Sequence, residues 1–368
     1  MSEELVALVA LTQVEGIGGK HIRLLRQRLS SLAALWEEKP RPGLPARLQE
    51  ALARRSTLRK TAETLIEKAQ LLGIRLIPYW EADFPRLLHE IPQPPALLYQ
   101  KGPLSLNALP LVAVVGTRKP SPYGLKATTY FVEALVEAGV GIVSGLAYGI
   151  DARAHQVTIE KGGKTVAVLA HGLDKIYPAT HRRLAEAILA EGAWISEYPP
   201  GAPLHPLQFP FRNRLIAGLA HLTLVIESRE KGGALHTAHA AFVANRPVFA
   251  VPGEIFTPSA QGCYQLIVQQ VAQLAYSPAQ LLEELRLQTA TLPLSPTPIH
   301  PTGPTDPLHA QIYAFLGEGP KAVDEIIART GLSAAEIAQH LLLMEIEGWI
   351  TQRGGNLVLR TTPPNATS

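Results

Sequence analysis

Between residues 110 and 287, short apolar runs alternate with stretches of helical periodicity, and no other feature limits the possible folds of this chain as much. The runs are apolar throughout, which is typical of strands buried on both faces of a sheet. Strands that alternate with helices predict an α/β fold, a doubly wound, Rossmann-like and mostly parallel sheet. We expect strands at Leu111–Val115, Gly141–Ser144, Thr165–Ala170, Ala193–Glu197, Leu222–Glu227 and Pro247–Val251, and helices over 122–138, 149–161, 180–191, 212–220, 234–244, 264–274 and 278–287.

The first 75 residues have helical periodicity only, and the segment Val14–Lys20 joins two of their apolar runs. A hydrophobic residue between glycines, joining two short helices, is typical of a helix-hairpin-helix unit. Such a hairpin can offer backbone N–H groups to a phosphate at a helix N-terminus. An ordinary glycine turn in a small helical bundle explains the same pattern, so both interpretations stay open.

Proline-rich segments and a final change of pattern divide the rest of the chain. Residues 76–109 are punctuated by prolines and are expected to form a connector. After a Pro/Thr-rich stretch, a helix, a helix-turn-helix and two short strands indicate a winged helix. We therefore expect a helical domain over 1–75, a Rossmann-like domain over 76–287, a linker over 288–306, a winged-helix domain over 307–361 and a disordered tail over 362–368.

Composition excludes several classes of protein. Hydrophobic residues make up 46% and charged residues 18%, which excludes a disordered chain. The single cysteine, Cys263, excludes a disulfide framework and a multi-cysteine metal site. The first residues carry acids where a secretory signal needs bases, and no apolar run reaches the ~18 residues of a membrane span. We expect a cytoplasmic protein with no membrane contact.

Charge is distributed unevenly along the chain. Lys and Arg exceed Asp and Glu by five in residues 1–75, by one in 76–287, and fall three short in 288–368. A polyanion should therefore prefer the first two segments.

The loops that follow the predicted strands are where an open parallel sheet binds ligands. The first of them contains Gly116, Thr117, Arg118 and Lys119, and then Ser121-Pro122, which fit the N-cap and first position of a helix. A glycine, two cations and a helix N-terminus together predict a phosphate site.

Later loops are expected to add residues at the same edge. Ser144 and Gly145 follow the second strand, Lys175 follows the third, and Lys231 lies in a glycine turn after the fifth. These glycines and lysines allow close backbone approach to a ligand and attract anions, although a glycine turn by itself needs no ligand.

The segment from Phe209 to Arg214 combines two aromatic residues with two arginines that flank an amide, Asn213. Arg212 and Arg214 suit a phosphate backbone, and an aromatic ring suits stacking on unpaired bases. We expect one of the two rings, Phe209 or Phe211, to belong to the core.

The sequence gives less support to an enzyme, or to sequence-specific binding of duplex DNA, than to a phosphate-binding site. Gly163-Lys164-Thr165 leads into a strand, which is the wrong order for a P-loop, and no set of metal ligands has suitable spacing. We expect no cofactor, no metal and no catalytic residue. The presumed recognition helix, 333–347, contains no Lys or Arg, which favours contact with protein over base reading.

Six ordered motifs resemble the DprA (Smf) family of DNA-processing proteins: VGTRKPSPYG, SGLAYGIDARAH, HGLDKIYP, ISEYPPG, FPFRNRLIAGLA and VFAVPG. The resemblance implies a SAM-like helical domain, an extended Rossmann domain and a winged helix. It implies a non-enzymatic recombination mediator that binds and protects single-stranded DNA, loads the RecA recombinase onto it in natural transformation, and forms a homodimer through the Rossmann domain. By motif, it assigns Arg118 to the glycine-hydroxyl-x-arginine loop, and Phe209, Arg212 and Arg214 to the DNA pocket.

Two other functions remain as alternatives. Rossmann-like proteins also include phosphoribohydrolases that cleave nucleoside monophosphates, whose Pro-Gly-Gly-x-Gly-Thr loop is approached only by Pro252-Gly253-Glu254. A transcription regulator acting through the winged helix is the third interpretation.

Overall fold

The computed structural model describes residues 2–29, 31–37, 46–290, 306–346, 349–353 and 357–360. The chain forms two compact units, one from residue 1 to 292 and one from 293 to 368. The expected tail, and nearly all of the expected linker, lie outside the described residues.

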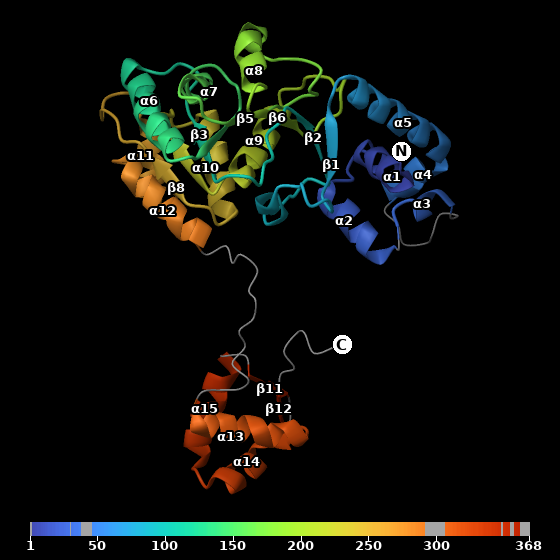
Figure 1. Ribbon diagram of the computed structural model, residues 1–368, viewed down its shortest axis with the longest axis vertical. Helices are drawn as coiled ribbons and strands as arrows, with labels where there is room; N and C mark the ends of the chain where they lie inside the picture. Colours follow the sequence, from blue (N-terminus) through green and yellow to red (C-terminus); the bar gives the residue numbers. More distant parts are fainter. Residues whose placement is uncertain are drawn as a thin grey trace. The chain divides into compact units, whose positions relative to one another are not determined.

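A nine-stranded sheet runs through the first unit among the described residues (Figure 1). Its order is β1-β2-β6-β5-β4-β3-β7-β8-β9, and it is parallel except where β2 pairs with β1 and with β6. The predicted doubly wound sheet is confirmed. The strands are β1 Arg75–Pro78, β2 Leu97–Lys101, β3 Leu111–Val115, β4 Gly141–Ser144, β5 Thr165–Val168, β6 Ala193–Ser196, β7 Leu222–Val225, β8 Val248–Ala250 and β9 Gln273–Leu274.

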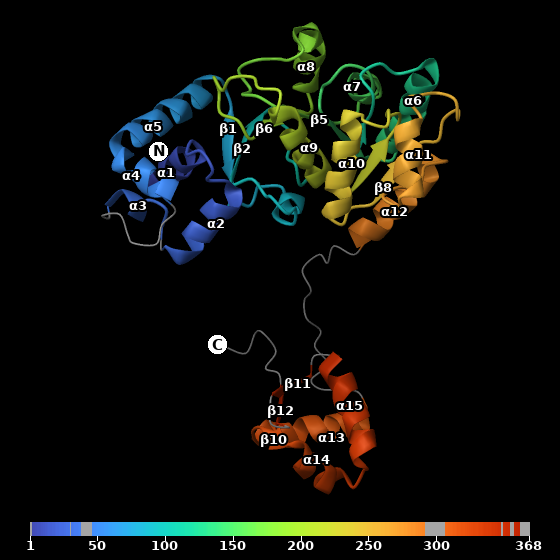
Figure 2. The same cartoon turned by 180° about the vertical axis from the view of Figure 1, so that it is seen from behind.

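Helices cover both faces of the sheet because the strand side chains are apolar in both directions. In β3, Val112 and Val114 pack with α6 and α12 on one face, and Ala113 and Val115 pack with α9 and α10 on the other. Figure 1 shows α6 on the near side, and Figure 2 shows α9 and α10 from behind. The helices are α6 Pro122–Glu137, α7 Ile150–Glu160, α8 Arg182–Ile188, α9 Gln208–Leu219, α10 Gly233–Val243, α11 Gln261–Val268 and α12 Pro278–Ala290.

Several expectations from the sequence were wrong in detail. The connector over 76–109 contributes β2 and most of β1, because the apolar run at Leu97 pairs antiparallel with β6. Residues 273–274, expected to be helical, form the edge strand β9. Helix α9 begins at Gln208 rather than 212, so Phe209 and Phe211 lie in its first turn, and neither ring belongs to the buried core, where one of them was expected.

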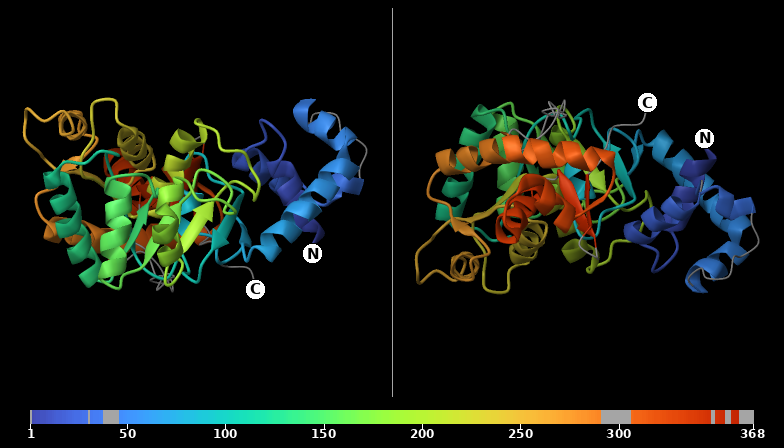
Figure 3. Two further views of the ribbon diagram at one scale, coloured as in Figure 1. Left: turned by 90° about the horizontal axis from the view of Figure 1, so that it is seen from above. Right: turned by 90° about the horizontal axis from the view of Figure 1, so that it is seen from below.

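The N-terminal helices pack against the β1–β2 end of the sheet (Figures 1 and 3). They share one apolar core with the sheet, in which Leu8 and Ile66 lie with Tyr99 and Trp194. The helical segment is therefore built into the first unit. Its helices are α1 Glu3–Thr12, α2 Gly19–Arg28, α3 Ala34–Glu37, α4 Ala46–Ala53 and α5 Arg55–Leu71.

The second unit is a winged helix, as predicted. Its core contains Ile312, Ile326, Leu341 and Val358, and its sheet has the order β10-β12-β11. Its elements are α13 Pro307–Phe315, β10 Lys321–Ala322, α14 Val323–Thr330, α15 Ala334–Ile346, β11 Ile350–Arg353 and β12 Leu357–Arg360.

Candidate nucleic-acid interface

A hollow of about 760 Å³ lies beyond the carboxyl ends of β3 and β7. We call it the carboxyl-edge pocket. Loops after several strands and the first turns of α9 and α10 line it. Of the residues predicted from sequence, it brings together Gly116, Thr117, Arg118, Phe209, Arg212, Asn213 and Lys231.

Aromatic rings and an exposed cation form one wall of this pocket. The Arg118 guanidinium carbon lies 5.9 Å from the centroid of the Phe209 ring. The ring of Tyr177, 46% exposed, lies 5.7 Å from that of Phe209 and is tilted by 58°. Arginine beside aromatic faces is an arrangement that can hold a phosphate and stack a base together.

Arg212 lies in the floor of the pocket and is only 5% exposed. Its Nη1 donates to the carbonyl oxygens of Gly145, at 3.0 Å, and of Val168, so it ties together the ends of β4 and β5. A Cβ at Gly145 would come within 2.6 Å of Arg212 Nη2 and 2.8 Å of Asp151 Oδ2, so only glycine leaves room for both groups. Burial lowers the pKa of Arg212 to about 10, and the neighbouring Asp151 carboxylate opposes that shift.

Asp151, 6% exposed, completes this buried layer. Its Oδ2 accepts a hydrogen bond from the Gly145 N–H at 3.1 Å. Burial raises the pKa of its carboxyl group, and Arg212 acts in the opposite direction. Ser144 is fully buried and donates through Oγ to the Val114 carbonyl at 2.7 Å. Ser144 and Gly145 thus support the pocket from beneath and do not line it.

A carboxylate lies at the N-terminus of α6, where the sequence predicts a phosphate site. Ser121 is the N-cap and Pro122 the first helical residue, as expected. However, the buried carboxylate of Glu227 accepts hydrogen bonds from the Ser121 N–H at 2.9 Å and from its Oγ at 2.6 Å. A negative charge already occupies this helix end, so an incoming phosphate must rely on the exposed Arg118 and Lys119 side chains.

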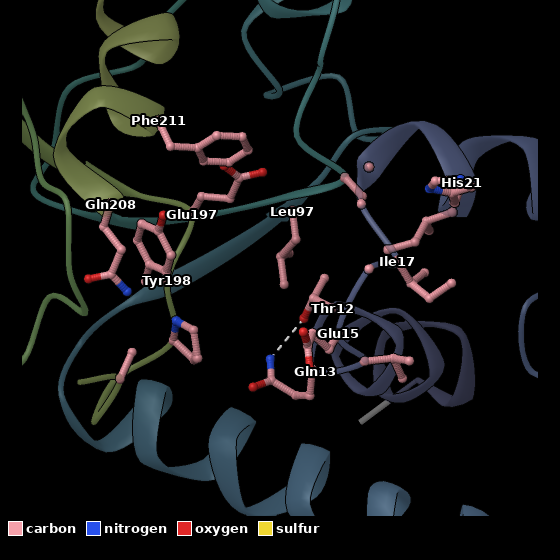
Figure 4. A pocket seen from close by; sticks show the side chains of 18 of the residues that line it. Thr12, Gln13, Glu15, Ile17, His21, Leu97, Glu197, Tyr198, Gln208 and Phe211 are labelled. Carbon is pink, nitrogen blue, oxygen red and sulfur yellow. Dashed lines mark hydrogen bonds between the residues drawn. The ribbon is translucent and has the colours of Figure 1, made fainter. Parts of the chain in front are cut away.

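Arg214 faces away from the carboxyl-edge pocket and forms an ion pair with Glu197. The two side chains are 13% and 21% exposed, and the Phe211 ring lies 4.3 Å from the Arg214 guanidinium carbon. These residues line a second hollow of about 910 Å³, the hairpin pocket, between the α1–α2 turn and the loop after β6 (Figure 4). The structure therefore divides the Phe209–Arg214 segment between two sites.

The remaining predicted residues, Lys119 and Lys175, are exposed but line neither pocket. Sequence reasoning missed Tyr177 and Arg229, which line the carboxyl-edge pocket. Both residues lie in loops that follow predicted strands, and this position could have identified them as candidate site residues. The nucleic-acid-binding roles of all these residues remain predictions.

Two properties of the described residues bear on other kinds of site. They contain no cluster of three or more His, Cys, Asp or Glu side chains suited to a metal ion. Among them, too, no helix combines the length and the apolar character needed to cross a membrane.

Comparison with known proteins matches both units of the chain. Residues 75–286 match the family model described as DNA recombination-mediator protein A, and residues 295–356 match the DprA winged helix domain. The chain is 36% identical to protein Smf of Synechocystis sp., covering 94% of this chain and 96% of that protein. It is 39% identical to DNA processing protein DprA of Bacillus subtilis, covering 58% of this chain and 72% of that protein.

Two solved structures resemble the chain. DNA processing protein A from Streptococcus pneumoniae aligns with a TM-score of 0.64 and 30% identity, over 77% of this chain and 98% of that one. A structure describing the single-stranded DNA binding mode of DNA processing protein A from Helicobacter pylori aligns with a TM-score of 0.53 and 26% identity, over 58% of this chain and 95% of that one.

Proposed function

Because the chain belongs to the DNA recombination-mediator protein A family, we propose that its carboxyl-edge pocket binds single-stranded DNA. The observation that carries this proposal is the exposed Arg118 guanidinium beside the Phe209 and Tyr177 rings. A phosphate meets the cation, and an unpaired base stacks on a ring. The Helicobacter pylori relative, described by its single-strand binding mode, supports the same ligand.

The buried layer in the floor of the pocket supports binding by holding the pocket in shape. Arg212 donates hydrogen bonds to the Gly145 and Val168 carbonyls, and Asp151 accepts one from the Gly145 amide. These bonds fix the loop ends from which the pocket is built, so little ordering cost remains when a strand binds.

A direct test compares labelled single-stranded and duplex oligonucleotides across a salt series, without a nucleotide cofactor. We expect tighter binding of the single strand, and a loss of affinity in Arg118→Ala. Arg286→Ala is the matched control, because Arg286 is 80% exposed on α12, outside both pockets. Equal binding of both oligonucleotides, or equal effects of both variants, would refute the proposal.

We further propose that the bound strand is protected and then transferred to the RecA recombinase, as the family resemblance implies. The test measures RecA filament assembly on a single strand already covered by a single-strand binding protein. Addition of the full-length chain should accelerate assembly, and Arg118→Ala should not. Acceleration by a variant that no longer binds DNA would contradict transfer through this pocket.

The homodimer is also a proposal, supported by exposed apolar side chains beside the β9 edge of the sheet. Phe242, Val268 and Leu274 are 52%, 81% and 44% exposed there. A hydrophobic surface of this kind marks a protein interface. Val268→Glu should give a monomer in sedimentation analysis. Leu71→Glu, at an 89% exposed position on α5, should leave the dimer intact.

Among the described residues, the segment nearest in sequence to a phosphate loop gives little support for nucleotide cleavage. Around the Pro252–Glu254 segment, Tyr123 Oη donates to the Pro252 carbonyl at 2.7 Å, and Tyr264 Oη donates to the Gly253 carbonyl. Two carbonyl groups of the segment that most resembles a phosphate loop therefore already accept hydrogen bonds from tyrosine hydroxyls. Incubation with AMP should release no free base.

A further inference from the structure

The hairpin pocket adjoins the proposed DNA site and shares an element with it. The loop between β6 and α9 lines both hollows, with Pro199–Pro203 on the hairpin side and Leu204 and Pro206 on the carboxyl-edge side. Phe209 and Phe211 are two residues apart on α9, which turns them about 200° from one another. The ring of Phe209 therefore lines one hollow, and the ring of Phe211 lines the other.

Both walls of the hairpin pocket are fixed in place. On one side, Arg23 Nη2 donates to the Pro95 carbonyl at 2.9 Å, and its guanidinium lies 4.3 Å from the Tyr79 ring centroid. Gly19 packs so closely on Pro94 that a Cβ there would collide with the carbonyl oxygen.

On the other side, Asp174 holds the loop after β6. It accepts a hydrogen bond from the Gly201 N–H at 2.8 Å, and its carboxylate lies 3.8 Å from Lys68 of α5. The hollow is therefore preformed, as ligand sites usually are, and its volume of about 910 Å³ falls in the ordinary range for such sites.

The chemistry of this pocket suits a base better than a phosphate. Its arginine, Arg214, is already neutralised by Glu197. The lining is largely apolar, with Ile17 and Leu97 facing Phe211 and Tyr198 across the hollow (Figure 4). Phe211 is 45% exposed, so one face of its ring is accessible. A flat, uncharged ring with polar edges complements such a surface.

We propose that the hairpin pocket receives a second unpaired base of the single strand held in the carboxyl-edge pocket. The inference rests on the proposed function. A helix with its side chains is about 10–12 Å across, and a strand extends at least about 3.4 Å per nucleotide, so about two to four nucleotides connect the two bases. The exposed Lys20 at the hairpin meets a phosphate that flanks the second base. A continuous strand thus occupies both sides of α9.

The test places the fluorescent base 2-aminopurine at successive positions of an oligothymidine and measures its emission on binding to the full-length chain. Two positions, separated by about two to four nucleotides, should respond. Thr61→Trp fills the hairpin pocket from the exposed surface of α5 and should abolish the second response only. Thr64→Trp is the matched control, because Thr64 is also exposed on α5 and does not line the pocket.

Phe211→Ala provides a second, independent measurement. It should weaken binding of an oligonucleotide long enough to reach both hollows by roughly five- to a hundredfold, and leave a shorter one unchanged. A single responding position, or no effect of Thr61→Trp and Phe211→Ala in folded protein, overturns the inference while Arg118→Ala still weakens binding. Absence of any single-strand binding by the unmodified chain overturns the proposed function as well. A peptide that binds in the hairpin pocket and leaves both 2-aminopurine responses unchanged would also overturn the inference.

Discussion

The two hollows beside α9 contain the same pair of residue types, a phenylalanine ring and an arginine, in opposite electrostatic states. In the carboxyl-edge pocket, Arg118 is exposed next to Phe209. In the hairpin pocket, Arg214 is largely buried next to Phe211 and is paired with Glu197. An exposed cation attracts phosphate, whereas a buried and paired one is already neutralised, and its removal leaves the partner's buried charge uncompensated. Burial and the partner, rather than residue type, decide which role an arginine has.

The largest expected effect distinguishes the two arginines by stability. Arg214→Ala leaves the Glu197 carboxylate without its partner and should lower the free energy of unfolding by about 3 kcal/mol. Arg118→Ala should leave that free energy within about 0.5 kcal/mol, since Arg118 is exposed. Urea denaturation of both variants measures the difference. The double variant Glu197→Leu/Arg214→Met removes both charges and should recover most of the loss. If the two single variants were equally stable, Arg214 would not have the structural role that separates it from Arg118.

The next effect concerns the rings. Phe209→Ala should weaken single-strand binding by about 1–3 kcal/mol, the cost of one stacked base, with no change in salt dependence. Phe209 is partly exposed in the first turn of α9, so the variant should remain folded. Circular dichroism and melting are checked first. If the variant melts with the roughly 3–5 kcal/mol loss of a deleted core ring, Phe209 belongs to the core instead.

A smaller effect is expected in the salt dependence of affinity, which should differ between the two pockets. Each phosphate contact on a single strand releases counterions, so Arg118→Ala should flatten the log–log salt dependence of affinity by roughly 0.7 units. Phe211→Ala, in the hairpin pocket, should not alter that slope. Titrations at several salt concentrations measure both. A flatter slope for Phe211→Ala would mean that loss of the ring also removes a phosphate contact.

The smallest effect is expected from the winged helix. Removal of residues 307–368 should leave single-strand affinity within a few-fold, because these residues have a net charge of −2. Instead of cations, helix α15 exposes the apolar residues Leu342 and Leu343, at 55% and 41%. Binding of the truncated chain to the same oligonucleotides measures this. A large loss in a folded truncation would place part of the DNA site in this unit.

Sequence patterns predicted the fold well because periodicity is local. The six predicted strands between 110 and 251 all occur. The strand-end loops gave four of the residues that line the carboxyl-edge pocket, and the Phe209–Arg214 segment gave three more. The connector strands were missed because proline spacing concealed the short apolar run at Leu97. The edge strand at 273–274 has only two residues, too few for any period to appear.

The sequence by itself determined the layered sheet, the winged helix and the loops at which a ligand would meet the protein. Only the tertiary structure decided how Arg118, Arg212 and Arg214 differ. The partners that bury the latter two, Asp151 and Gly145 for one and Glu197 for the other, lie many residues away and meet them only after the sheet has formed. The hairpin pocket has the same origin, since its walls come from the α1–α2 turn and the loop after β6. Burial and pairing between distant segments leave no periodic trace in a sequence.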